Sequence, residues 1–188
     1  AELLKTEQRQ QGRMFGEKAG LMLYYDYNRD TQHRRLFAID YRNPANPKLI
    51  SDLSTRDRYN DIGSPVMKSL PNGRNVVRQA DDDIYLSGTG ASPDGDRPFL
   101  RKLNLATLRS EELWRSGVEE YEAFVALLSD DGTAFLTRKE SVVDPPNIYL
   151  RKVCPAGQAC TATASKQLTE FKDPSPQRRG IQKQSAKY

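Results

Sequence analysis

The chain has 188 residues, of which 37% are hydrophobic and 29% charged, and its formal net charge at pH 7 is +4. That length suits one domain or part of one. No segment reaches the roughly 18 consecutive apolar residues of a membrane-spanning helix. Acidic residues are interleaved with the basic ones, whereas nucleic-acid binding needs a concentrated basic face. We therefore expect neither a membrane nor a nucleic acid as a partner.

The first part of the chain predicts a polar lead-in followed by three strands. Residues 1–17 are polar and are typical of a helical or frayed segment. Strands are expected at 21–27, 34–40 and 48–53, with a turn at 28–31 and an Asn/Pro-containing loop at 41–47. We assign residues 18–56 to a first, partial β unit.

A second β unit is expected at residues 57–117 and a third at residues 118–174. In the second unit Asn72-Gly73 predicts a hairpin turn, because this pair tolerates the positive φ that such turns require. Asp131-Gly132 predicts the corresponding turn in the third unit. The expected strands are 64–70, 75–79, 84–88, 98–104 and 111–115 in the second unit, and 124–128, 134–138, 147–153 and 166–171 in the third.

Large apolar residues end the three units at similar spacing, since Leu53, Trp114 and Phe171 are 61 and 57 residues apart. Such spacing is typical of four-stranded propeller blades with a long loop. The fold class that we predict is all-β, a partial β-propeller of about three four-stranded antiparallel blades. An ordinary β-sandwich, which also has many short strands at regular spacing, is the alternative.

Four segments of the chain carry a family likeness. The longest reads Gly-Thr-Gly-Ala-Ser-Pro-Asp-Gly-Asp-Arg-Pro-Phe-Leu at residues 88–100. The others are residues 57–65, residues 120–122 with 125–127, and residues 168–174. Together they resemble the propeller domain of the prolyl oligopeptidase superfamily of serine peptidases, in its glutamyl endopeptidase-like branch. The likeness covers about residues 20 to 188.

The resemblance implies that this segment is separated from the catalytic domain of its enzyme. Enzymes of this kind follow the propeller with an α/β-hydrolase domain that carries the catalytic Ser, Asp and His. On that pattern, residues 175–188 are a linker and the severed first strand of such a domain. The segment is then non-catalytic, and its propeller controls the access of short or unfolded peptides to the hydrolase site.

Three arginines, Arg97, Arg101 and Arg138, are our candidates for contact with an acidic side chain of a peptide substrate. The alternative is ordinary ion pairing with neighbouring carboxylates such as Asp96 and Glu140. The partners that the resemblance implies are a peptide substrate, bound through the parent enzyme, and the missing hydrolase domain. Open strand edges would also allow self-association.

The chain's own residues do not suggest a serine triad, which needs a nucleophile, a histidine base and an orienting carboxylate. His33 is the single histidine, and beside two arginines we expect it at a surface strand position without an orienting partner. Ser92 follows Gly90-Ala91 but lacks the second glycine of a nucleophile elbow, and Pro93 comes directly after it. We expect the segment alone to be inactive and its parent to be a serine peptidase.

Cys154 and Cys160 are separated by five residues, of which three are small and one is a proline. This spacing favours a disulfide that closes a hairpin loop, the alternative being two free thiols. A disulfide indicates an oxidising compartment. We therefore expect a periplasmic or secreted bacterial protein.

No metal or cofactor is expected. The acidic runs at residues 81–83 and 130–131 lack the alternating oxygen ligands and distal glutamate of a calcium loop, and turn chemistry explains them. Two other functions stay open. One is a stand-alone β-propeller-type module that binds a protein or peptide. The other, more distant, is a glycan-binding or glycan-hydrolysing propeller, for which no paired carboxylates stand out.

Overall fold

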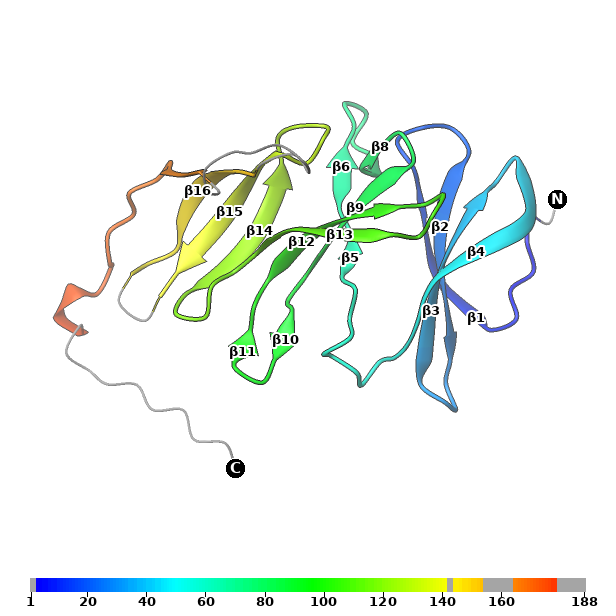
Figure 1. Ribbon diagram of the computed structural model, residues 1–188, viewed down its shortest axis with the longest axis horizontal. Helices are drawn as coiled ribbons and strands as arrows, with labels where there is room; N and C mark the ends of the chain where they lie inside the picture. The colour runs from blue at the N-terminus through cyan, green and yellow to red at the C-terminus, as the bar shows by residue number, and fades with distance from the viewer. Residues whose placement is uncertain (1–2, 142–143, 154–163, 179–188) are drawn as a thin grey trace.

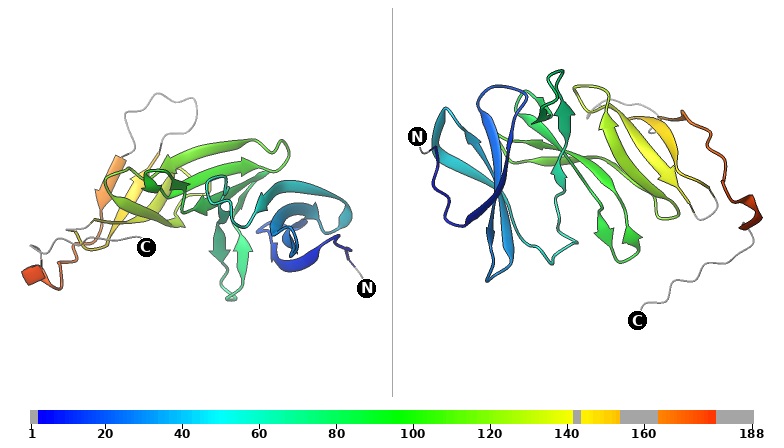
Figure 2. Two further views of the ribbon diagram at one scale, coloured as in Figure 1. Left: turned by 90° about the horizontal axis from the view of Figure 1, so that it is seen from below. Right: turned by 180° about the vertical axis from the view of Figure 1, so that it is seen from behind.

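A computed structural model of the chain is built from antiparallel sheets that follow one another along the long axis of the molecule (Figure 1). The structure describes residues 3–141, 144–153 and 164–178. In both further views the sheet formed within residues 64–115 lies between the sheet of residues 9–54 and the sheet of residues 121–167 (Figure 2). The prediction of an all-β fold with about three four-stranded antiparallel sheets is confirmed. Within these ranges, no helix is long and apolar enough to span a membrane.

Sheet 1 contains four strands in the order β1 (Arg9–Phe15), β2 (Leu21–Asn28), β3 (His33–Asp40) and β4 (Asn43–Ser54). The prediction that the lead-in is helical or frayed is wrong, because β1 pairs with β2 along its whole length. Its polar sequence is tolerated because β1 is an edge strand and mostly exposed. The loop expected at residues 41–47 is also largely strand. Pro44 and Pro47 fit there because β4 is the other edge, where a missing N–H costs no ladder bond.

The residues that precede β1 pack on sheet 1 as well. Leu4 contacts a buried cluster of Met22, Tyr24 and Ile39 on β2 and β3. Glu7 accepts a hydrogen bond from Arg35, 3.0 Å away, and Arg35 also binds the buried carboxylate of Asp26 through two further bonds. The lead-in therefore covers one face of sheet 1.

Sheet 2 follows the order β13 (Ser110–Arg115), β12 (Phe99–Asn104), β9 (Asp83–Gly88) and β5 (Ser64–Pro65), with β8 (Gln79–Ala80) also paired to β9. The turn predicted at Asn72-Gly73 is confirmed, with Gly73 at φ +78°. It joins β6 (Met67–Ser69) to β7 (Asn75–Val77) in a separate two-stranded hairpin. A second hairpin, β10 (Ala91–Ser92) with β11 (Gly95–Asp96), lies between β9 and β12.

Sheet 3 contains β14 (Tyr121–Leu127), β15 (Ala134–Glu140), β16 (Asn147–Lys152) and β17 (Ala164–Gln167) in chain order. The turn at Asp131-Gly132 is confirmed, with Gly132 at φ +77°. The strand expected to reach Phe171 ends at Gln167 instead. Beyond it, the Asn147 side chain holds the chain, because its Oδ1 accepts bonds from the Phe171 N–H at 2.7 Å and from Thr169 at 2.9 Å. A 3₁₀ turn, η1 (Pro176–Arg178), follows.

Two apolar cores join the three sheets. Ile84 and Tyr85 are neighbours on β9, so their side chains point to opposite faces of sheet 2. Ile84 belongs to a core with Leu23 and Leu36 of sheet 1. Tyr85 belongs to a second core, shared with Leu100 and Trp114 of sheet 2 and Phe135 of sheet 3. Sheet 2 is thus buried on both faces, which explains its continuous apolar run at Ile84, Tyr85 and Leu86.

Tyr85 should make the protein less stable at alkaline pH. Burial, together with the nearby negative charge of Asp83, raises the pKa of Tyr85 to about 12. Between about pH 10 and 12 the unfolded chain loses a proton that the folded chain keeps, so the free energy of unfolding falls as pH rises. The hydroxyl also donates a 2.8 Å bond to the Asp130 carbonyl. We expect Tyr85→Phe to lower stability at neutral pH and to flatten this alkaline loss in urea unfolding measured from pH 8 to 12.

The exposed Tyr59 supplies the matched control, since Tyr59→Phe should leave the alkaline slope unchanged. An equally steep slope in Tyr85→Phe would show that other groups cause the alkaline loss of stability.

Two sequence-based expectations remain predictions. One is the division of the chain into units 1–17, 18–56, 57–117, 118–174 and 175–188. The other is self-association through the sheet edges.

Candidate functional site

The distinctive motif at residues 88–100 folds as the hairpin β10–β11 followed by β12. Gly90 opens it at φ +61°, and a Cβ there would lie 2.0 Å from the carbonyl oxygen of Arg97. The Arg97 N–H also donates to the Gly90 carbonyl at 2.9 Å. Only glycine fits this close approach of two backbone segments, and the approach fixes where Arg97 enters sheet 2.

Arginine side chains gather where β12 and β13 run side by side. Phe99 lies opposite Arg115 in the register of the two strands, and Arg101 lies opposite Glu112. The guanidinium carbons of Arg101 and Arg115 are 4.5 and 5.2 Å from the centre of the buried Phe99 ring. Cations over an aromatic face at this range are attracted by its quadrupole. Phe99 therefore serves as a platform for two arginines.

One carboxylate serves both of these arginines. Glu112 accepts two bonds from Arg115, at 3.0 and 2.6 Å, and forms a longer ion pair with Arg101 at 3.5 Å. The bonds from Arg115, with the nearby charge of Arg101, lower the pKa of Glu112. Arg115 also donates to the Arg97 carbonyl at 3.2 Å, and Arg97 donates to the Ser116 carbonyl at 3.1 Å.

We call Arg97, Arg101 and Arg115, with Glu112 and Phe99, the arginine cluster. The guanidinium groups of Arg101 and Arg115 share one carboxylate, so positive charge is in excess, and Arg97 joins them through its backbone carbonyl. Arg101 is opposite Leu86 on β9, and Leu86 belongs to the core between sheets 1 and 2. Since directly opposed side chains share a face, the cluster lies on the face of sheet 2 that looks toward sheet 1.

The structure brings two of the three predicted contact residues into this cluster. Arg138 lies apart from them on β15 of sheet 3, 3.6 Å from Glu140 and half exposed. The ion pair of Arg138 with Glu140 follows the alternative considered above, whereas Asp96 pairs with Arg58 at 3.4 Å. Sequence reasoning missed Arg115 and Glu112, because their proximity comes from cross-strand register. The Phe99/Arg115 pairing would have been found only by aligning β12 with β13.

His33 has an orienting partner, contrary to expectation. Its Nδ1 is 2.8 Å from a carboxylate oxygen of Asp52, and both side chains are nearly half exposed. The partner was missed because it lies on β4, diagonally across from His33 and two residues from its direct register partner Ser54. The hollow beside the imidazole is lined by Gln8, Asn28, Thr31, Arg35 and Asp52, and a serine is not among these residues. Ser54 lies opposite His33 in the β3–β4 register, but its hydroxyl accepts a bond from the Arg56 N–H, and within the described residues no serine hydroxyl is hydrogen-bonded to the imidazole.

The acidic runs lie in turns except for Asp83, which begins β9. Asp81, at φ +51°, pairs with Lys18, and Asp83 accepts a bond from Asn104 at 2.8 Å. Asp131 accepts bonds from Ser129 and Thr133, which lower its pKa. Over the described part of the chain, no group of three or more His, Cys, Asp or Glu is placed to hold a metal ion. Cys154 and Cys160 lie outside the described residues.

Comparison with curated proteins finds two plant relatives. A probable chloroplastic glutamyl endopeptidase of Oryza sativa subsp. japonica is 30% identical over 200 residues, which cover 99% of this chain and 21% of the relative. A protein of the same name from Arabidopsis thaliana is 30% identical over 184 residues, covering 89% of this chain and 18% of the relative. No family model matches. The chain thus spans about a fifth of these relatives, and their names point to a peptidase-related protein fragment.

The relatives also correct the prediction of location. Both are chloroplastic plant proteins, which contradicts the expectation of a periplasmic or secreted bacterial protein. That expectation depended on the spacing of Cys154 and Cys160 alone. A short Cys-to-Cys spacing fits free thiols as well as a disulfide, so it is a weak guide to the compartment.

Proposed function

We propose that the chain is a non-catalytic, partial-propeller segment of a serine endopeptidase of the prolyl oligopeptidase superfamily. In the whole protein it would control the access of peptides to an α/β-hydrolase domain outside this chain. The observation that carries the proposal is the 30% identity to two glutamyl endopeptidases over 99% and 89% of the chain. The succession of three antiparallel sheets (Figure 1) is compatible with adjoining blades.

The side-chain geometry supports a non-catalytic role. A serine triad needs a serine hydroxyl hydrogen-bonded to a histidine that a carboxylate orients. This chain has a single histidine, and its Nδ1 faces Asp52. The neighbouring hollow offers a threonine but no serine. In this proposal the hydrolytic nucleophile therefore lies elsewhere in the whole protein.

The arginine cluster is the contact site that we propose for an acidic peptide side chain. Arg115 is held by two short bonds to Glu112, whereas Arg101 is held by one longer ion pair. A carboxylate of the peptide would therefore bind Arg101 first, and the planar guanidinium suits it through two parallel bonds. Arg138 remains a separate candidate on sheet 3.

The coding sequence of the gene tests the proposal directly. We expect it to continue past Tyr188 into a Gly-x-Ser-x-Gly nucleophile elbow, followed by the aspartate and histidine of an α/β-hydrolase. Sequencing a full-length transcript gives the answer. A stop codon close to Tyr188 would overturn the proposal and would favour a stand-alone binding module.

A further inference from the structure

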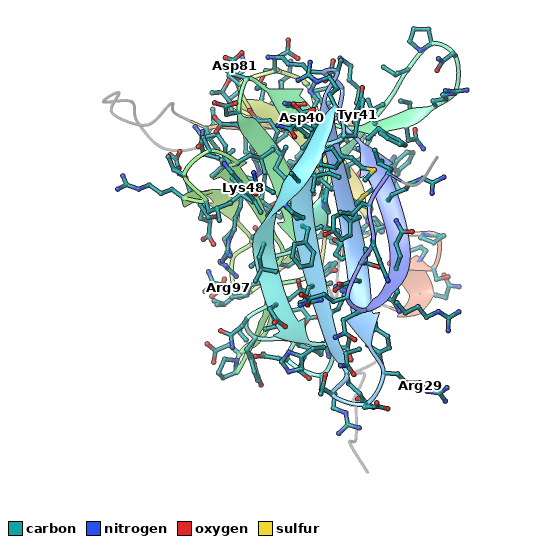
Figure 3. The ribbon with its side chains drawn as sticks, turned by 90° about the vertical axis from the view of Figure 1, so that its right-hand side faces the viewer. Arg29, Asp40, Tyr41, Lys48, Asp81 and Arg97 are labelled. Atoms are coloured by element: carbon teal, nitrogen blue, oxygen red, sulfur yellow. The ribbon has the colours of Figure 1, made fainter. Side chains whose placement is uncertain are left out.

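A cleft opens between sheets 1 and 2 at the end of the molecule where four turns meet. Its volume is about 660 Å³, within the range of roughly 300–1,000 Å³ common for ligand sites. The walls are lined by residues 18–21, 38–40, 42, 43, 46, 48, 79, 81, 82, 105 and 106. In Figure 3, Asp40 and Asp81 lie near the upper end of the molecule with Lys48 below them, whereas Arg29 lies at the opposite end. We call this hollow the rim cleft.

Contacts across the rim cleft hold its two walls together. On one side, the Lys18 ammonium is 2.8 Å from the Asp81 carboxylate. On another, the Lys48 ammonium donates to the carbonyls of Leu105 and Ala106 at 3.0 and 3.3 Å. Each of these contacts joins sheet 1 to a turn of sheet 2. The rim cleft is therefore preformed, and neither sheet could make it alone.

The floor of the rim cleft is shaped by glycine. Gly20 has φ +111°, and a Cβ there would lie 2.5 Å from the guanidinium of Arg42. Arg42 in turn binds Asp40 through two bonds of 2.9 and 2.8 Å. The planar guanidinium thus lies against bare backbone, where any other residue at position 20 would displace it.

Charges of both signs remain available to a ligand. Lys48 bonds only to neutral carbonyl groups, so no carboxylate among the described residues neutralises it. The exposed Asp82 carboxylate makes no hydrogen bond or ion pair within the described residues. Lys48 belongs to β4 of sheet 1 and Asp82 to the turn between β8 and β9 of sheet 2, so the two available charges belong to opposite walls.

We propose that the rim cleft binds an extended peptide that carries one acidic and one basic side chain. Lys48 binds the acidic side chain and Asp82 the basic one, each through a charge-assisted hydrogen bond. The side-chain amides of Asn43, Asn46 and Gln79, which also line the cleft, can bond peptide groups. The choice of a peptide among amphoteric molecules rests on the proposed function.

Other ligand classes fit the rim cleft less well. A nucleotide or another polyanion would be repelled by the carboxylates of Asp40, Asp81 and Asp82, which match the three cations in number. A sugar usually stacks on an aromatic ring, and the residues that line the rim cleft include none. An extended peptide with one acidic and one basic side chain presents both charges and also neutral backbone donors and acceptors, so it matches both walls.

Nuclear magnetic resonance of the isotope-labelled chain tests this proposal. The probe is a flexible, end-blocked ten-residue Gly/Ser peptide with one aspartate and one lysine three residues apart. We expect its titration to shift the amide signals of Gly20, Asn43, Asn46 and Ala106. Asp82→Asn should weaken binding about tenfold, as expected for the loss of one charge-assisted hydrogen bond, without touching the contacts that join the walls. Lys48→Met should weaken it at least as much.

Two controls make the result specific. Lys102→Met removes a cation of sheet 2 that pairs with Glu111 outside the rim cleft, and it should leave the affinity unchanged. A probe with asparagine and glutamine in place of its charges should bind at least tenfold more weakly. The inference would be overturned by absent shifts at the cleft, by equal binding of the neutral probe, or by binding of a polyglutamate or maltose probe alone. None of these outcomes depends on whether the gene encodes a serine elbow, so the two proposals fail independently.

Discussion

Arg151→Met should lower the free energy of unfolding by about 3–5 kcal/mol, the range seen when one partner of a buried ion pair is removed. Glu122 on β14 is nearly fully buried, and its carboxylate binds two nitrogens of Arg151 and the hydroxyl of Thr137. The Glu122 N–H donates to the Ser116 hydroxyl at 3.1 Å, which ties this network to the end of sheet 2. Without Arg151 the carboxylate stays in the interior with one hydroxyl partner.

Urea unfolding followed by circular dichroism measures this loss. Arg138→Met is the matched control on the same sheet, because Arg138 is half exposed and its contact with Glu140 is 3.6 Å long; we expect a change below about 1 kcal/mol. Adding Glu122→Leu to Arg151→Met should recover part of the loss, since no buried charge is left unpaired. An Arg151→Met variant within about 1 kcal/mol of the parent would contradict the buried network.

Phe135→Ala should cost about 3–5 kcal/mol, as large-to-small changes of buried aromatic residues do. Phe135 is fully buried on β15 in the core between sheets 2 and 3. Its ring centre is 5.8 Å from that of Trp114 and 6.2 Å from that of Phe124. The cavity left by alanine lies at the contact between two sheets, so it weakens their packing as well as sheet 3 itself.

The single tryptophan makes this effect easy to follow. Trp114 fluorescence should change in the folded Phe135→Ala variant and should report a lower urea midpoint. Leu128→Ala, at a position that is 54% exposed, is the control and should change the free energy of unfolding by less than about 1 kcal/mol. A Phe135→Ala variant as stable as this control would show that sheets 2 and 3 do not share this core.

Local sequence signals predicted the strands in which apolar and polar residues alternate and the turns that contain a glycine after Asn or Asp. The strands that became β2, β3, β9 and β15 were found in this way, as were the turns at Gly73 and Gly132. β1 was missed because an exposed edge strand needs no apolar alternation, and it is held by pairing with β2. The end of sheet 3 was missed because side-chain bonds to Asn147, rather than ladder bonds, position Phe171.

The candidate sites depend on contacts between distant parts of the chain. Arg97 lies in the motif at residues 88–100 and Arg101 directly follows it, but Arg115 and Glu112 join them only through the register of β12 and β13. Asp52 reaches His33 across β3 and β4. The rim cleft requires four turns to meet, which no local pattern encodes. Composition and residue spacing were therefore enough to predict the fold class. The candidate sites could be identified only from the packing of the folded chain.

The central claim is that this chain assists a serine peptidase without carrying its nucleophile. Labelling the full-length product of the gene with a fluorophosphonate, beside the purified 188-residue chain, tests it most directly. The account predicts one labelled serine in the full-length protein, located beyond Tyr188 by peptide mass mapping, and an unlabelled chain. A label on any serine within residues 1–188 would contradict it.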